Sequence, residues 1–293
     1  MLVTSELQPQ WNAIIIEALK TFIEICEKND LKYFCVGGTA IGAVRHHGMI
    51  PWDDDIDVCM PRPDYERFIE LFKKGEDTNY ELVTPYNDDN YPLPSLKFCN
   101  KYTTLMEDAL TPCITGLYID ILPVDGTSDN RDEAIKLFHK YGKIKNRLNA
   151  ISRHYSFFKY LGLLTNIREW GQFIYKTIAF CNRKKYRQSL LRQLRDISYK
   201  YPFDTATNVL VYSGSYGERE VYPKKWIENT IKMSFENMMV ALPQEYDSYL
   251  HNIFGDYMKL PPERDRTPKH NKTYFNMSKR ESLENIKYKY KKI

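Results

Sequence analysis

The sequence lacks the features that mark membrane-spanning, secreted or nucleic-acid-binding proteins. No apolar run approaches the roughly 20 residues that a transmembrane helix needs, and runs such as Ala13–Ile16 are far shorter. The first residues do not show the pattern of a signal peptide, and we expect none. The net charge is only +4, from 42 basic and 38 acidic residues, which is too small to indicate nucleic acid. We expect a cytoplasmic protein without a transmembrane segment that binds no nucleic acid, and we leave open peripheral contact with the inner face of the membrane.

Paired cysteine motifs are also missing. The six cysteines show neither a Cys-x-x-Cys pair nor the spacing of a zinc site. They are Cys26, Cys35, Cys59, Cys99, Cys113 and Cys181. Buried free thiols in a reducing compartment are therefore predicted.

Internal repeats, low-complexity linkers and sharp changes of composition are absent as well. A chain of 293 residues with 43% hydrophobic residues is long enough for one large α/β domain with additions, or for two small domains. We divide it into a core at 1–128, a helical region at 129–205 and a C-terminal part at 206–293. The C-terminal part holds a predicted hairpin around Glu236-Asn237, then a helix and an extended lid-like segment.

The most informative stretch runs from Phe34 to Asp57. A short β-branched and aromatic strand stops at Gly37-Gly38, where a ligand can approach the backbone without obstruction by a Cβ atom. Thr39 is predicted to cap a brief helix that ends near Gly48. This order of strand, glycine turn and helix suits a phosphate-bearing ligand.

An acidic run follows the turn. Four of the five residues from Asp53 to Asp57 are aspartates, and the alternating pattern after it puts Asp55 and Asp57 on one strand face. Solvated loops and helix caps explain many single Asp-x-Asp pairs. Like charges this close repel by about 1 kcal/mol or more per pair, so a cluster of four favours a bound cation. Oxygen ligands alone favour Mg²⁺ or Mn²⁺ over zinc.

Two later strands carry further charged residues. Lys97 lies in a predicted strand at 95–101, where a solvated lysine and a phosphate-neutralising lysine are both possible readings. Asp120 interrupts the apolar segment 116–125, and a carboxylate buried there needs a cation or hydrogen bonds to compensate for lost hydration. Asp125, before Gly126, is interpreted as a turn residue.

The longest specific pattern is Gly-Gly-Thr-x-x-Gly-Ala-Val-Arg-x-x-Gly-x-Ile-Pro-Trp-Asp-Asp-Asp-Ile-Asp, from Gly37 to Asp57. It resembles the LicD family, bacterial phosphocholine transferases with fukutin-related relatives. Lys97, Thr104 and Asp120 continue the resemblance, as do the Phe254-Gly255-Asp256 segment, Arg266 and His270. The resemblance implies an α/β (α+β) nucleotidyltransferase-like mixed sheet with flanking helices, a helical insertion and a C-terminal hairpin and lid.

The resemblance also implies roles for particular residues. Asp55, Asp57 and Asp120 are expected to be catalytic and to bind Mg²⁺ or Mn²⁺, with Asp120 as third ligand or base. Residues expected to bind substrate are Gly37, Gly38, Thr39, Arg45, Trp52, Lys97 and Arg266. Trp52 or Tyr257 offers an aromatic face for a quaternary ammonium, although Trp52 may equally pack beneath the acidic loop.

The implied reaction is metal-dependent transfer of phosphocholine, or of a similar phospho-alcohol, from a CDP-linked donor. The acceptor would be a hydroxyl of a cell-surface glycan, its precursor or a polyol, free or lipid-linked, and CMP would be released. Two other readings stay open: a nucleotidyltransferase that uses a nucleoside triphosphate, and a non-catalytic module that binds glycan or nucleotide. The complete acidic set argues against the non-catalytic module.

Overall fold

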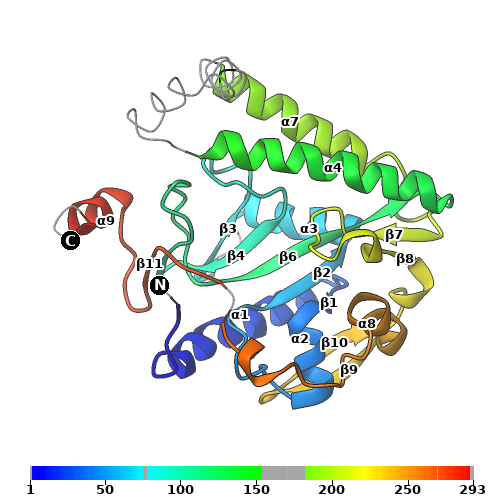
Figure 1. Cartoon of the computed structure of the whole chain (residues 1–293), viewed down its shortest axis with the longest axis horizontal. Helices are drawn as coiled ribbons and strands as arrows, with labels where there is room; N and C mark the ends of the chain where they lie inside the picture. The colour runs from blue at the N-terminus through cyan, green and yellow to red at the C-terminus, as the bar shows by residue number, and fades with distance from the viewer. Residues whose placement is uncertain (1, 76–77, 154–169, 171–181, 269, 291–293) are drawn as a thin grey trace.

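The computed structural model describes residues 2–75, 78–153, 170, 182–268 and 270–290 (Figure 1). Within these residues, Cys26, Cys35, Cys59, Cys99 and Cys113 are buried and free, as predicted, while Cys181 lies outside them. None of the described helices is long and apolar enough to cross a membrane.

A mixed sheet forms the centre of the molecule, which confirms the predicted α/β (α+β) class. Its strands run in the order β1-β2-β6-β4-β3, and the C-terminal part of β6 continues into pairing with β7 and then β8. The strands are β1 (Phe34–Cys35), β2 (Asp57–Pro61), β3 (Tyr80–Val83), β4 (Leu96–Asn100), β6 (Tyr118–Thr127), β7 (Asn208–Leu210) and β8 (Val221–Pro223). The β2–β6 pair is parallel, whereas the other pairs are antiparallel.

Two amphipathic helices, α1 (Gln8–Lys28) and α3 (Arg62–Lys73), pack their apolar sides against the sheet. Phe22 of α1 contacts Phe68 of α3 and Phe98 of β4, with ring centroids 5.2 Å and 6.3 Å apart. Because side chains alternate along a strand, this packing buries Ile119 and Ile121 of β6 and turns the neighbouring Asp120 to the opposite face.

A second core lies between α4 (Arg131–Ser152) and α7 (Arg183–Ser198), which run side by side over the sheet (Figure 1). Both helices lie in the region 129–205 that was predicted to be helical, and part of this region lies outside the described residues. Asn130 caps α4, and its side chain accepts a hydrogen bond of 3.1 Å from the amide of Glu133.

The C-terminal part contains the predicted hairpin, formed by β9 (Thr230–Phe235) and β10 (Met238–Pro243). Asparagine tolerates the left-handed turn conformation well, yet it is Glu236 and not Asn237 that takes it, with φ +52°. The reason is a tertiary contact: the Glu236 amide donates to His47 O, and its carboxylate accepts from the Met49 amide at 2.8 Å. The hairpin turn therefore holds the loop that precedes the acidic run.

The remaining elements are short. They are α2 (Gly37–Ile41), the π-helix η1 (Gly42–His46), β5 (Thr104–Met106), η4 (Gly217–Glu220), η5 (Lys224–Trp226), α8 (Tyr246–Phe254), η6 (Glu263–Asp265), β11 (Tyr274–Asn276) and α9 (Leu283–Tyr290). Strand β11 pairs with β5 in antiparallel fashion and so returns the C-terminal segment to the core.

Asp125 is a structural residue rather than the predicted turn residue. It lies inside β6, only 1% exposed, and accepts two hydrogen bonds from the Arg62 guanidinium, at 2.6 Å and 2.9 Å. The pair joins the start of α3 to the sheet, and the paired geometry compensates both charges for lost hydration.

We predict that Asp125→Asn lowers the free energy of unfolding by about 3 kcal/mol, because it leaves the buried Arg62 guanidinium without its counter-charge. Urea unfolding measures this. Glu66→Gln removes a half-exposed partner of the same arginine and should cost less than about 1 kcal/mol. Equal losses in the two variants would contradict a special role for Asp125.

Candidate functional site

The glycine turn opens directly into a helix. Helix α2 begins at Gly37, which has φ +58°, and Val36 occupies the N-cap position. Thr39 therefore lies within the helix and does not cap it, contrary to prediction. Its buried hydroxyl accepts a hydrogen bond of 2.9 Å from the Asp57 amide and so ties α2 to the start of β2. A Cβ atom on Gly38 would stand 2.1 Å from Asp53 Oδ2, so a larger residue here would push the Asp53 side chain away from the turn.

A cavity of about 490 Å³ opens in front of this turn. Gly37, Gly38 and the three predicted carboxylates, Asp55, Asp57 and Asp120, all line it. The β2–β6 pairing sets Asp57 directly beside Asp120, and Asp55 lies just before β2. The sequence predicted that Asp55 and Asp57 point to the same side, and both line this cavity.

The carboxyl groups disturb one another strongly. Burial, followed by the charges of Asp55 and Asp120, raises the pKa of Asp57 well above its usual range. Burial and then Asp55 raise the pKa of Asp53 to about 8. Each ionised carboxylate disfavours ionisation of its neighbours, so the site favours the binding of protons or of a cation.

Lys97 lies against Asp120 and does not line the cavity. Its Nζ is 3.1 Å from Asp120 Oδ1, 3.6 Å from Glu107 Oε2 and 3.3 Å from the centre of the Tyr118 ring, and the residue is only 2% exposed. Burial raises the pKa of Asp120 to about 6, although the lysine acts in the opposite direction. Lys97 therefore supports and orients Asp120.

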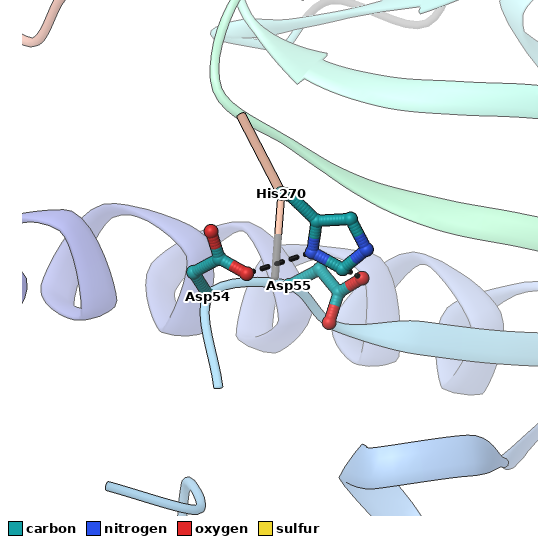
Figure 2. Close-up of side chains that lie close together, drawn as sticks. All are labelled: Asp54, Asp55 and His270. Atoms are coloured by element: carbon teal, nitrogen blue, oxygen red, sulfur yellow. Dashed lines mark hydrogen bonds and ion pairs between the residues drawn. The ribbon is translucent and has the colours of Figure 1, made fainter. Parts of the chain in front are cut away.

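A second cluster, formed by Asp54, Asp55 and His270, shares Asp55 with the first (Figure 2). Asp54 is 3% exposed, and its two oxygens meet His270 Nδ1, at 2.7 Å, and Lys272 Nζ. His270 Nδ1 also lies 3.4 Å from Asp55 Oδ2. Among the described residues, Asp54, Asp55 and His270 are the three whose possible metal-ligand atoms all come within 4.8 Å of one another.

This second cluster largely neutralises its own charge. Burial raises the pKa of Asp54, but hydrogen bonds from His270 and Lys272 outweigh burial and leave the pKa below its usual range. The hydrogen bond to Asp54 in turn raises the pKa of His270. One oxygen of Asp54 is engaged by His270 and the other by Lys272, so neither is open to a metal ion in this arrangement.

Arg45 and Arg266, which were also predicted to bind substrate, hold the C-terminal segment instead. Arg45 donates to the carbonyl oxygens of Tyr257 and Lys259. Arg266 donates to Pro261 O at 2.9 Å, and its guanidinium lies 5.5 Å from the centre of the Trp52 ring. Trp52 lines the cavity, whereas neither arginine does.

The structure adds cavity residues that the sequence did not indicate, because they come from three separate parts of the chain: the loop at 213–217, η4 and α4. Tyr216 lines the cavity together with Glu220 and Lys145. Glu220 is 3% exposed, and its carboxylate accepts from the Tyr216 amide at 3.2 Å. Tyr257, by contrast, is 5% exposed and donates its hydroxyl to Asp247, so its ring is not available to a ligand in the cavity.

A double glycine at the start of a helix, with carboxylates on two neighbouring parallel strands, defines a nucleotidyltransferase-type site. The comparison with protein families agrees: residues 30–145 match the family described as LicD/FKTN/FKRP, nucleotidyltransferase domain. This match supports the resemblance to the LicD family that the sequence pattern had indicated.

Similarity to one characterised relative extends much further along the chain. The lipopolysaccharide cholinephosphotransferase LicD of Haemophilus influenzae is 27% identical over 262 residues, which cover 88% of this chain and 93% of the relative. Uncharacterised proteins of Rickettsia typhi and Rickettsia prowazekii are 34% and 35% identical over 68 residues, 23% of this chain and 22% and 26% of theirs.

Glu220 gives the site a testable pH dependence. Burial raises the pKa of this carboxyl from 4.5 to about 7, so the protonated form is favoured by folding. The associated stability is present below pH 4.5 and is lost as the pH rises through 7. We predict that Glu220→Gln, which stays neutral, becomes more stable relative to wild type between pH 5 and 8, on the order of 1–3 kcal/mol.

Chemical unfolding of both proteins across this pH range provides the measurement. The exposed Glu245→Gln serves as a matched control and should show no such trend. A difference between Glu220→Gln and wild type that stays constant with pH would show that Glu220 does not titrate there.

Proposed function

We propose that this protein transfers phosphocholine, or a similar phospho-alcohol, from a CDP-linked donor to a hydroxyl of a cell-surface glycan or its precursor, releasing CMP. The observation that carries the proposal is the pairing of Asp57 with Asp120 in a cavity that also holds Asp55 and the Gly37-Gly38 turn. The printed activity of the Haemophilus influenzae relative supports choline phosphate as the transferred group.

The cavity carboxylates suit Mg²⁺ or Mn²⁺. Asp55 and Asp57 would hold the ion, with Asp120 as the third oxygen ligand or as the base. Burial and then mutual repulsion raise the pKa of Asp57, and a bound cation would relieve this repulsion. When bound, the metal supplies charge stabilisation to the diphosphate and to the departing CMP.

The protein's own residues prepare the reaction around this point. Gly37 and Gly38 leave room for the donor diphosphate to approach the backbone, and Thr39 fixes the Asp57 amide. Lys97 holds Asp120 beside Asp57. Arg45 and Arg266 fix the segment 257–266 against Trp52 and the π-helix. They would therefore affect donor binding indirectly, by holding this segment in place.

In the proposed step, the oxygen of an acceptor hydroxyl attacks the choline-side phosphorus in line. The bond between this phosphorus and the CMP oxygen breaks, and Asp120, whose pKa is raised toward neutrality, takes the hydroxyl proton. CMP leaves as the second product, and phosphocholine remains on the acceptor.

Product identity tests this reaction against nucleotidyl transfer. The protein is incubated with Mg²⁺ and candidate glycan acceptors, together with CDP-choline, CDP-ribitol, CDP-glycerol or CTP. We expect acceptor-dependent CMP and an acceptor mass increase equal to one phospho-alcohol. Pyrophosphate from CTP, without CMP from any CDP-alcohol, would instead establish a nucleotidyltransferase.

We predict that Asp57→Asn lowers the transfer rate at least a hundredfold, because it removes a charge that holds the metal. The same variant should melt no lower than wild type in EDTA, since it also removes a crowded buried charge. The exposed Asp196→Asn is the matched control and should change neither property. Transfer near the wild-type rate at saturating metal would remove Asp57 from the catalytic set.

A melting experiment separates the two possible ligand sets. Millimolar Mg²⁺ or Mn²⁺ with CDP-choline should raise the melting temperature at matched ionic strength, because ligands that bind only the native state stabilise it. We expect Asp55→Asn and Asp57→Asn to lose most of the metal-dependent increase and His270→Ala to keep it. Loss in His270→Ala with retention in Asp57→Asn would move the metal to the Asp54, Asp55 and His270 cluster.

A further inference from the structure

One aromatic side chain stands out in the wall of the catalytic cavity. Tyr216 is 41% exposed, and its ring packs edge-on against Phe254, with centroids 4.8 Å apart and ring planes at 71°. Both residues line the cavity and come from the C-terminal third of the chain. The ring of Tyr216 is therefore supported from one side and open to the cavity.

This ring lies next to the reacting centre. The Tyr216 hydroxyl is 3.8 Å from the point where a Cβ atom on Gly37 would stand, and Asp57 Oδ2 is 3.1 Å from the same point. Burial, and then the charges of Asp57, Glu220 and Asp55, raise the pKa of the Tyr216 hydroxyl. The ring thus stands in a field that favours a positively charged ligand.

The loop that carries Tyr216 is fixed in place. Glu220 accepts from the Tyr216 amide, and a Cβ atom on Gly214 would stand 2.1 Å from Glu220 Oε1, so this glycine lets the carboxylate close the loop. Lys145 donates to Ser213 O at 3.0 Å on the other side. A ring held in this way binds a ligand without first having to be ordered.

The other aromatic candidates are engaged elsewhere. The Trp52 ring already has the Arg266 guanidinium over it, at 5.5 Å. Tyr249 lines the cavity but is 2% exposed and packs against Tyr222. Tyr257 is buried and bonded to Asp247.

We propose that the ring of Tyr216, backed by Phe254, binds the quaternary ammonium group of the choline moiety and so selects the donor. A quaternary ammonium cannot donate a hydrogen bond, and it is recognised by an aromatic face and by nearby negative charge. Tyr216 offers the aromatic face, and Asp57 and Glu220 offer the negative charge, beside the glycine turn. This inference rests on the proposed function and assigns its donor specificity to one side chain.

A pair of donors that differ only in charge tests the inference. CDP-choline is compared with CDP-3,3-dimethylbutanol, in which a neutral carbon replaces the ammonium nitrogen. Calorimetric binding in Mg²⁺ without acceptor, and kcat/KM with acceptor, are measured for both. We expect wild type to prefer CDP-choline by roughly 3- to 30-fold, the range of such contacts.

The variants assign this preference to a residue. Tyr216→Leu keeps apolar contact with Phe254 and should bring the ratio of the two donors close to one. Tyr216→Phe should keep the preference, since the ring face remains. Trp52→Leu should keep it as well, and Tyr102→Leu, at an exposed tyrosine outside the cavity, is the matched control.

The two proposals fail in different ways. Three results would overturn the assignment to Tyr216 and leave the proposed transfer reaction standing. They are equal binding of both donors by wild type, a preference for CDP-choline that survives Tyr216→Leu, and a preference that is lost only in Trp52→Leu. Charge-selective binding that depends on Tyr216, without any acceptor-dependent CMP, would support the assignment and refute the proposed transferase.

Discussion

The parallel pairing of β2 with β6 is the constraint on which the rest of the site depends. It brings Asp57 and Asp120 side by side, an arrangement that mutual repulsion opposes and that no local preference of either strand would create. The surrounding structure compensates for it. Phe22, Phe68 and Phe98 bury the opposite face of the sheet, and Lys97 reaches Asp120 from the next strand. The hydrophobic core thus holds together charges that would otherwise separate.

Much of the frame could be predicted because its signals are local. Apolar residues at helical spacing mark α1 and α3, and alternation along the chain placed Asp55 and Asp57 toward one cavity. The errors occur where a distant contact overrides a local preference. Threonine is a common helix cap, yet the Thr39 hydroxyl accepts a hydrogen bond from the Asp57 amide instead. Asparagine favours the left-handed turn conformation, yet Glu236 takes it, because its carboxylate also accepts a hydrogen bond from the Met49 amide.

The residues that complete the site could not be found from spacing at all. Asp54 was one of four aspartates within residues 53–57, and nothing nearby in the sequence distinguishes it from Asp53. Its partners His270 and Lys272 are 216 and 218 residues further along the chain. Glu220 and Tyr216 likewise reach the cavity from a loop whose sequence carries no motif. A family pattern pointed to His270 and Arg266 but could not say that they contact Asp54 and Trp52.

The contact between Asp54 and Lys272 also bears on how the polypeptide acquires its structure during synthesis. The family match ends at residue 145, but Asp54 within it stays without its lysine until residue 272 has emerged from the ribosome. Strand β11, which follows Lys272, must then pair with β5, from which it is separated by more than half the chain. A nascent chain that contains the whole matched domain would still hold an uncompensated acidic loop. Completion of the site is therefore a late event in folding, because it waits for a segment 218 residues further along the chain.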